Sequence, residues 1–344
     1  MKVGLVYDPI YLAHDTGHHV ESVQRLEAVM GHLNQIGMLE RLALVSPEEA
    51  SEGLLTLVHT PEHVASIRRF AEQGGGALTA DTVMSSASYK AACFAVGGLV
   101  KGVDLVMTGQ LDSVFALVRP PGHHATSARA MGFCLFNNVA LAAKHAKCKY
   151  GLQRILIADF DVHHGNGTQE AFYSDPGVLY FSVHEYPFYP GTGGLAEIGA
   201  GLGTGYTVNV PLPAWSSGLE YLRAFEEVLV PVARRFQPQL ILVSAGYDAH
   251  WADEMSLMQL SVRDFGQMVG ILRQLADNLC GGKVALVLEG GYHPQALAHS
   301  VETTLAVLLG ERPAPDPLGL VPAQVRPPSV DRLFQIIKEL HRLV

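Results

Sequence analysis

Residues 153–165 read QRILIADFDVHHG, an apolar, strand-like run that leads directly into Asp159, Asp161 and His163. Alternate side chains of a strand share one face, so we expect these three side chains to point the same way. A carboxylate and an imidazole two residues apart supply half of a zinc site. Taken alone, the D-x-H fragment is equally compatible with polar residues that end a strand and cap the following helix.

Apolar and β-branched runs of strand length recur on both sides of this stretch. They occupy residues 2–7, 112–118, 153–160, 178–184, 204–210, 239–245 and 283–289. Between several of them lie amphipathic patterns typical of helices, at residues 21–36, 85–102, 137–148, 218–235 and 262–279. This alternation predicts an α/β fold, in which a parallel sheet carries helices on both faces.

Polar residues with catalytic chemistry follow three other predicted strands at their carboxyl ends. RPPGHHA at 119–125 carries His123 and His124, SAGYDA at 244–249 carries Asp248, and LEGGY at 288–292 carries Tyr292. The paired glycines of LEGGY, Gly290 and Gly291, allow close approach of the backbone. Because open α/β sheets bind ligands beyond the carboxyl ends of their strands, four strands converge on one predicted site.

The residue types at these strand ends suit amide hydrolysis. Asp161, His163 and Asp248 match the three protein ligands of a catalytic zinc ion, which keeps a fourth position for water. The tandem histidines remain as general acid and base, and Tyr292 as a hydroxyl donor to a developing oxyanion. In this scheme zinc polarises the carbonyl, one histidine takes a proton from water, and a protonated histidine delivers one to the departing amine.

The composition limits what the chain binds and where it works. Its 344 residues, 48% of them hydrophobic and 17% charged, suffice for one large core. A formal net charge of -9 argues against a nucleic-acid partner, because such binding needs clustered Lys and Arg. The four cysteines form no C-x-x-C pair, and no secretory signal or run of about 20 apolar residues is present. We expect a cytoplasmic protein without membrane contact.

Taken in order, the motifs of this chain resemble the arginase/deacetylase fold and, within it, the histone deacetylase superfamily, which includes bacterial acetylpolyamine amidohydrolases. The resemblance rests on H-x-E-x-x-x-R at 19–25, then RPPGHHA, GFCLFNN, DFDVHHGNGTQ, PGTG, NVPL, SAGYDAH and LEGGY. It covers nearly the whole chain before the C-terminal tail. It implies a three-layer α/β/α domain whose central, mostly parallel sheet has about eight strands.

Carried over residue by residue, the resemblance implies the same zinc ligands, the same histidine dyad and the same tyrosine that the residue types indicated above. It further implies that Asp159 pairs with His123 and that Asn166 pairs with His124, as in class II relatives. A neutral partner raises the pKa of His124 less than a carboxylate would. This histidine is therefore the readier of the two to act as a base near neutral pH.

The resemblance also implies a structural potassium ion and a substrate tunnel. The ion would be held by the Asp159 side chain, the main-chain carbonyls of Asp161, His163 and Val183, and the Ser182 hydroxyl. The acyl-lysine tunnel would be walled by Phe133 and Tyr189, with Gly132 at its floor and Gly290 and Gly291 beside the substrate. Tyr189 stands where phenylalanine is common, so its hydroxyl either meets a more polar linker or points to solvent.

Several residues depart from the family pattern or leave two interpretations open. Met255 stands at the rim, where polyamine-specific relatives carry an acidic gatekeeper, and this favours acetyl-lysine over charged polyamines. The adjacent Glu254 is interpreted as a solvated carboxylate, and as a gatekeeper only if the local turn differs. Arg25 either lines an inner channel or lies on a helix surface. Three histidines near the mouth are candidates for substrate contact, namely His14, His18 and His250.

Residues 1–310 are interpreted as one deacetylase catalytic domain. Residues 311–344, a proline-rich segment followed by an amphipathic segment at 329–343, pack on that domain or on a partner subunit of a homo-oligomer. The predicted activity is zinc-dependent removal of acetyl or other short acyl groups from N-acetyl-lysine side chains or similar amines. Three alternatives stay open: an acetylpolyamine deacetylase, a non-catalytic protein that binds acylated ligands, and a binuclear manganese ureohydrolase.

Overall fold

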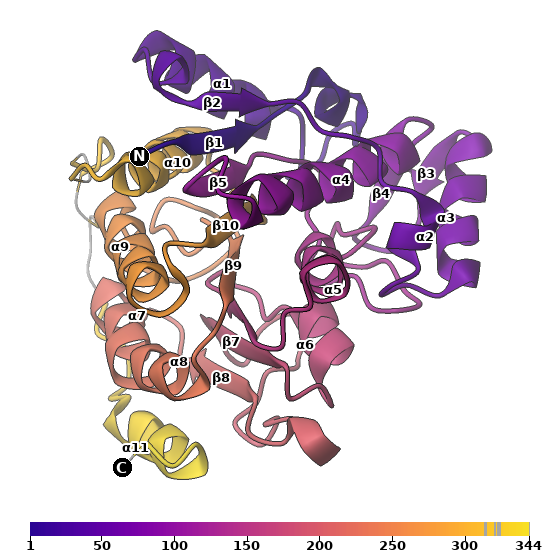
Figure 1. Ribbon diagram of the computed structural model, residues 1–344. Helices are drawn as coiled ribbons and strands as arrows, with labels where there is room; N and C mark the ends of the chain where they lie inside the picture. Colours follow the sequence, from indigo (N-terminus) through magenta and orange to yellow (C-terminus); the bar gives the residue numbers. More distant parts are fainter. Residues whose placement is uncertain (313–314, 320, 322–324, 344) are drawn as a thin grey trace.

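Eight strands form the central sheet of the computed structural model, which describes residues 1–312, 315–319, 321 and 325–343 (Figure 1). Their order is β2-β1-β5-β10-β9-β6-β7-β8, and all neighbouring pairs are parallel. The strands are β1 Val3–Val6, β2 Ala43–Val45, β5 Ser113–Ala116, β6 Ile155–Asp159, β7 Val178–Glu185, β8 Thr207–Leu212, β9 Leu240–Ala245 and β10 Val284–Leu288. The predicted parallel sheet of about eight strands is confirmed.

Helices cover both faces of this sheet, which gives the predicted three-layer α/β/α arrangement (Figure 1). One layer contains α1 Gln24–Gln35, α7 Gly218–Arg223, the π-helical turn η4 Ala224–Leu229, α8 Val230–Phe236, α9 Val262–Cys280 and α10 Pro294–Leu309. The other contains α4 Ser88–Met107, α5 Asn138–Tyr150 and α6 Asn166–Phe172. Beside this second layer lie α2 Glu52–Leu55, α3 Pro61–Glu72 and an antiparallel pair, β3 Gly75–Ala77 and β4 Val83–Ser85. Among the described residues, no helix combines the length and apolar character that crossing a membrane requires.

The two edges of the sheet differ from the sequence prediction. β2 was not predicted, because it has only three residues and pairs with β1 alone, leaving Leu44 63% exposed. The strand predicted at 204–210 begins instead at Thr207 and runs to Leu212, since a 3-10 turn, η3 Gly201–Gly203, precedes it. Pro211 is tolerated in this strand because β8 is the other edge of the sheet.

The prediction that Asp159, Asp161 and His163 share one face of a strand is wrong. β6 ends at Asp159, and the next residues form bends that leave the sheet. Asp161 and His163 are therefore placed by hydrogen bonds of this loop rather than by strand alternation. The Nδ1 atom and main-chain N–H of His163 both lie close to Oδ1 of Asp161, at 3.2 and 2.9 Å.

The amphipathic segment predicted at 329–343 forms a shorter helix, α11 Asp331–Leu340, which packs on η4 and β8 of the same chain. Phe334 and Ile337 are buried in this contact, and the Arg223 guanidinium lies 4.6 Å from the centre of the Phe334 ring. The proline-rich segment predicted at 311–328 includes residues 313–314, 320 and 322–324, which lie outside the described residues.

Glycines allow the long buried helix α4 to lie close to its neighbours. A Cβ atom on Gly97 would stand 1.8 Å from the carbonyl oxygen of Glu48, and one on Gly98 would stand 2.9 Å from the Val6 side chain. A contact with a backbone atom cannot be relieved by turning a flexible side chain. The position of α4 against the loop that follows β2 therefore depends on the missing side chain of Gly97.

We expect Gly97→Ala to lower the free energy of unfolding by about 1–3 kcal/mol, because the added methyl group overpacks a rigid contact. Gly270→Ala in α9 is the matched control, since its Cβ would meet nothing within 4 Å. That change should leave stability unchanged or raise it by about 0.5–1 kcal/mol through helix propensity. Urea unfolding followed by circular dichroism measures both, and equal stabilities of the two variants would contradict the packing argument.

Candidate active site

The polar residues predicted at the strand ends gather beyond the carboxyl ends of β5, β10, β9 and β6, which are neighbours at the middle of the sheet. A cavity of about 250 Å³ opens above them. Its lining consists of Asp81, Pro121, His123, His124, Gly132, Phe133, His163, Phe188, Tyr189, Met255, Gly290 and Tyr292. The strand order thus places four predicted polar segments around one hollow.

Three predicted metal ligands, Asp161, His163 and Asp248, lie together at the base of this cavity. Each offers one ligand atom, and these atoms lie within 4.8 Å of one another. His163 Nδ1 is 3.2 Å from Asp161 Oδ1 and also 3.2 Å from Asp248 Oδ2. The three residues are almost fully buried, at 1%, 6% and 0% exposure respectively.

These residues fit a tetrahedral divalent metal ion. Two ligands that each lie about 2.0–2.1 Å from zinc are separated by roughly 3.3 Å in tetrahedral geometry, close to the observed spacing. Asp248 Oδ1 accepts a hydrogen bond from the Val162 N–H at 3.0 Å, whereas the buried Oδ2 has only the 3.2 Å contact with His163 Nδ1, which lacks hydrogen-bond geometry. A buried carboxylate oxygen without a partner is costly, and a metal ion would satisfy it.

Glycines close to the carboxylates leave room for this cluster. A Cβ atom on Gly246 would stand 2.1 Å from Asp161 Oδ2, and one on Gly290 would stand 2.1 Å from Asp248 Oδ2. The Gly290 N–H also donates to Asp161 Oδ2 at 2.7 Å. Gly246 and Gly290 are thus required by the close approach of backbone to carboxylate.

The first tandem histidine, His123, is surrounded by negative charge. Its Nδ1 lies 3.1 Å from Asp159 Oδ2, and its Nε2 lies 3.9 Å from Asp161 Oδ1. Burial opposes a charge on this imidazole, but the two carboxylates outweigh burial and raise the pKa of His123 to about 10. This histidine therefore carries a proton near neutral pH. The predicted pairing of His123 with Asp159 is present in the structure.

The second tandem histidine, His124, has the opposite electrostatic environment. Its Nδ1 lies 2.8 Å from the side-chain oxygen of Asn166, the partner that the sequence indicated. Burial, together with the positive charge of His123, holds the pKa of His124 well below its usual value. The ring is therefore neutral at physiological pH, with its Nε2 free of the Asn166 contact. Two adjacent imidazoles, 4.0 Å apart between ring centroids, thus differ in protonation.

Tyr292 lines the cavity, and Arg25 packs against its ring. The guanidinium of Arg25 lies 4.8 Å from the centre of the Tyr292 ring and donates to the carbonyl oxygen of Gly291 at 2.7 Å. Arg25 is 1% exposed, so its interpretation as a helix-surface residue is wrong. Burial raises the pKa of Tyr292 well above its usual value, and Arg25 opposes this only in part. The hydroxyl stays protonated and can donate a hydrogen bond.

Aromatic rings form the walls of the cavity, as expected for Phe133 and Tyr189. Tyr189 lies edge-on to His124, with ring centroids 5.1 Å apart. Its hydroxyl donates to Asp81 Oδ2 at 2.9 Å, so neither sequence expectation for this hydroxyl, a contact with a polar linker or with solvent, describes the observed bond. Gly132 is among the lining residues and lies against a catalytic candidate, since a Cβ there would stand 2.3 Å from His124 Cδ2.

Four residues near the cavity were not singled out in the sequence. Asp81 lines the cavity and accepts a hydrogen bond from the main-chain N–H of Gly132. Phe188 stacks on His163, with ring centroids 5.4 Å apart. Glu289 is fully buried, and its Oε2 accepts hydrogen bonds from the main-chain N–H groups of Gly122 and His123 at 2.7 and 3.1 Å. Asp253 accepts from the N–H groups of Tyr292 and His293. Only Glu289 carried a usable signal, as an acidic residue directly after an apolar strand.

Several other candidates lie away from the cavity. Gly291 is not among the lining residues. Glu254 is exposed and also absent from the lining, in agreement with the interpretation of Glu254 as a solvated carboxylate. His14 and His250 are buried, at 1% and 0% exposure, and neither is among the residues that line the cavity. His14 Nδ1 lies 2.6 Å from the Ser88 hydroxyl, and His250 Nε2 lies 3.0 Å from Asp316 Oδ2.

The residues named for a potassium ion lie below the metal cluster, where β6 meets β7. Asp159 and Ser182 are register partners on these adjacent strands, and Val183 follows Ser182. Asp159 is fully buried, and its Oδ2 accepts a hydrogen bond from the Tyr180 hydroxyl at 3.0 Å. The Ser182 hydroxyl lies 2.9 Å from His184 Nδ1.

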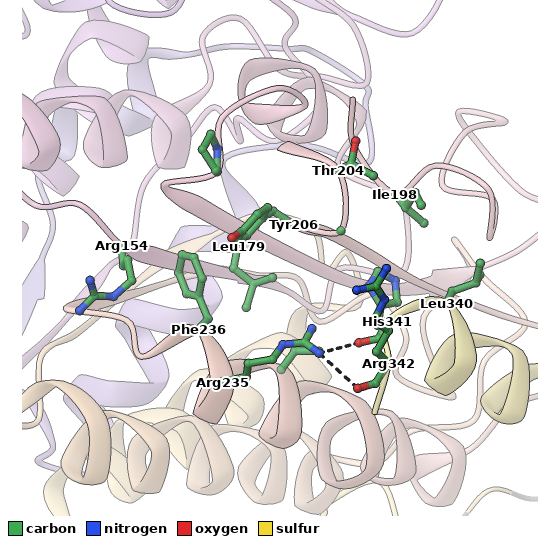
Figure 2. Close-up of a pocket in the computed structure, with 13 residues that line it drawn as sticks. Arg154, Leu179, Ile198, Thr204, Tyr206, Arg235, Phe236, Leu340, His341 and Arg342 are labelled. Atoms are coloured by element: carbon green, nitrogen blue, oxygen red, sulfur yellow. Dashed lines mark hydrogen bonds between the residues drawn. The ribbon is translucent and has the colours of Figure 1, made fainter. Parts of the chain in front are cut away.

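A larger cavity, of about 730 Å³, lies at the opposite, amino-terminal side of β6, β7 and β8 (Figure 2). Its lining includes Arg154, Tyr206, Phe236 and the end of α11. Arg235 donates hydrogen bonds there to the carbonyl oxygens of His341 and Arg342. Neither cluster of potential metal ligands found among the described residues lies in it. Size alone therefore does not mark the active site.

Comparison with known sequences agrees with this geometry. Residues 19–308 match the histone deacetylase domain family. Polyamine deacetylase HDAC10 of Mus musculus is 46% identical over 319 residues, which cover 89% of this chain and 47% of that protein. A probable deacetylase of Archaeoglobus fulgidus is 38% identical over 314 residues, which cover 90% of this chain and 87% of that protein.

A solved structure shows the same fold over nearly the full chain. The crystal structure of the HDA15 HD domain has a TM-score of 0.89 and 35% sequence identity, and covers 99% of this chain and 94% of that one. The chain spans about half the length of the mammalian HDAC10 proteins that it matches. With 290 consecutive residues in the family match and a shared fold, the chain belongs to the histone deacetylase family.

Proposed function

We propose that this protein is a zinc-dependent deacetylase, which hydrolyses acetyl or other short acyl groups from N-acetyl-lysine side chains or similar amines. One observation carries the proposal: a buried Asp161–His163–Asp248 cluster lies at the base of an aromatic-walled cavity, beside two histidines and a tyrosine. Residues 1–310 would be the catalytic domain, with residues 311–344 as its tail. The names of the deacetylase relatives support the same reaction class.

The Asp161, His163 and Asp248 side chains would hold the zinc ion, which when bound polarises the acyl carbonyl and lowers the pKa of the attacking water. His124, neutral because its pKa is lowered, would accept a proton from that water at Nε2. His123, protonated because its pKa is raised to about 10, would deliver a proton to the departing amine from its own Nε2. Opposite pKa shifts on two neighbouring groups are how enzymes separate acid and base roles.

Tyr292 would stabilise the oxyanion that develops on the substrate carbonyl. Its hydroxyl is kept protonated by burial, and the Arg25 guanidinium below the ring fixes its position. A donor aimed at developing charge in a dry site is worth about 10²–10³ in kcat. Phe133 and Tyr189 would hold the alkyl chain of the substrate between aromatic faces and exclude water.

We further propose that a potassium ion lies beneath the zinc and stabilises this loop. It would be bound by the Asp159 side chain, the Ser182 hydroxyl and the main-chain carbonyls of Asp161, His163 and Val183. The support is their location, since Asp159 and Ser182 are opposite each other on β6 and β7 and both are fully buried.

An acetylpolyamine is the second candidate substrate. Two observations favour it, namely the name of the HDAC10 relatives and a carboxylate, Asp81, in the cavity lining. Four hydrogen bonds hold the pKa of Asp81 below its usual value despite partial burial, so this carboxylate is charged. Against it, Met255 lines the rim and the acidic Glu254 does not. The apolar rim favours acetyl-lysine.

Turnover of a substrate panel tests the function. We expect the zinc-loaded protein to hydrolyse an acetyl-lysine peptide with a higher kcat/KM than acetylputrescine, acetylspermidine or longer acyl-lysines. A chelator should abolish the activity and added zinc should restore it. A preference for free polyamines would transfer the assignment to the second candidate, and binding without turnover would favour a non-catalytic receptor. Metal analysis that finds two manganese ions per chain, rather than zinc, would favour a ureohydrolase.

Replacing Tyr292 by phenylalanine tests the oxyanion role. We expect kcat on the acetyl-lysine peptide to fall by about 10²–10³, with KM little changed and zinc still bound, because the hydroxyl acts in the transition state. Tyr189→Phe is the matched control in the same cavity, since its hydroxyl already binds Asp81. It should keep most of kcat, and an unchanged kcat in Tyr292→Phe would refute the mechanism.

Replacing Asn166 by aspartate tests the base. A carboxylate stabilises the protonated imidazole, so the pKa of His124 should rise and a higher pH should be needed to free the base. The acidic limb of the kcat/KM profile should therefore move to higher pH by about one unit or more. Asn34→Asp makes the same change on the exposed face of α1 and should leave the profile unmoved. A profile unaltered in Asn166→Asp would exclude His124 as the base.

A further inference from the structure

A second group of potential metal ligands lies outside the active site, between α1 and α10. It consists of His32 from the last turn of α1 and of His299 and Glu302, three residues apart on α10. Their ligand atoms lie within 4.8 Å of one another. The two helices pack directly against each other, in the layer that holds α9 (Figure 1).

The three side chains converge on a single carboxylate oxygen. Glu302 Oε2 lies 2.6 Å from His32 Nε2 and 3.0 Å from His299 Nδ1, and the two imidazole rings are 4.1 Å apart between centroids. Residues three apart on a helix share a face, so α10 presents His299 and Glu302 together to α1. The two distances, 2.6 and 3.0 Å, are shorter than the roughly 3.3 Å between tetrahedral zinc ligands, and side-chain rotations would have to open them.

The chemistry and exposure of this group suit a metal ion better than a simple ion pair. Two imidazoles and one carboxylate form the His₂Glu set of several zinc enzymes, which leaves one position for water. The side chains are 16%, 22% and 18% exposed for His32, His299 and Glu302, so an ion and its water can enter from solvent. A comparable pair, His145 and Asp104 at 2.8 Å, lacks a second imidazole and shares its carboxylate with Lys149 and Tyr150.

We propose that His32, His299 and Glu302 form a second zinc site, which ties α1 to α10. Both helices are connected to the catalytic tyrosine candidate. α1 carries Arg25 under the Tyr292 ring, and α10 begins at Pro294, two residues after Tyr292. A bound ion would therefore stabilise the two elements that flank Tyr292 without touching the reacting atoms.

Metal stoichiometry of the full chain tests this proposal. After equilibration with zinc and removal of loose metal, plasma mass spectrometry should find two zinc ions per wild-type chain and one per chain of His32→Ala or His299→Ala. Asp161→Ala should likewise keep one ion, because only the active-site cluster is lost. Asp161→Ala therefore tests the site between α1 and α10 independently of the zinc site in the proposed deacetylase mechanism. One zinc in the wild type, with that ion lost in Asp161→Ala, would overturn the proposal.

Thermal unfolding gives an independent readout that does not depend on activity. Added zinc should raise the Tm of protein whose active site is already loaded, because a ligand that binds only the folded state stabilises it. The rise should vanish in His299→Ala and in Glu302→Gln, which keeps the size of the side chain should the alanine variant fail to fold. His145→Ala is the matched control and should retain the full rise. An equal rise in Glu302→Gln and the wild type would also overturn the proposal.

Discussion

Burial of four carboxylates at the carboxyl ends of the central strands is the constraint on which the rest of the site depends. All four are at most 1% exposed and either end or follow the central strands β6, β9 and β10. They are Asp159, Asp161, Asp248 and Glu289. Buried carboxylates are tolerated only with hydrogen bonds or opposite charge. Main-chain N–H groups satisfy Glu289 and Asp161, while one oxygen of Asp248 is left for a metal. The glycines beside these side chains follow from the same requirement for close backbone approach.

The same negative charge contributes to the different pKa values of two histidines that are adjacent in sequence. His123 faces Asp159 and Asp161 and has a raised pKa, whereas burial and the positive charge of His123 lower the pKa of His124, which faces the neutral Asn166. Neither shift arises from the histidine itself. The protonated ring of the dyad is thus a property of the carboxylates beneath it and the neutral ring a property of burial, and the acid and base roles proposed above depend on both.

A second buried charge network connects the N-terminal motif to the site. Glu21 is fully buried and binds Arg25 and Arg119, whose guanidinium donates to its Oε2 at 2.7 Å. Arg25 continues the network to the Gly291 carbonyl and to the Tyr292 ring. The H-x-E-x-x-x-R motif therefore acts as a brace beneath the tyrosine and fixes the start of α1. This brace and the proposed zinc site hold α1 at two points along its length.

The sequence by itself determined the central strands, the polar residues at their carboxyl ends and the candidate metal ligands, because apolar runs and short motifs are local features of a chain. It did not determine that β6 ends at Asp159, that Glu289 anchors the tandem histidines, or that Asp81 binds the Tyr189 hydroxyl. It also could not pair His32 with Glu302, which lie 270 residues apart. Those contacts depend on strand order and helix packing, which bring together segments whose separation along the chain carries no local signal.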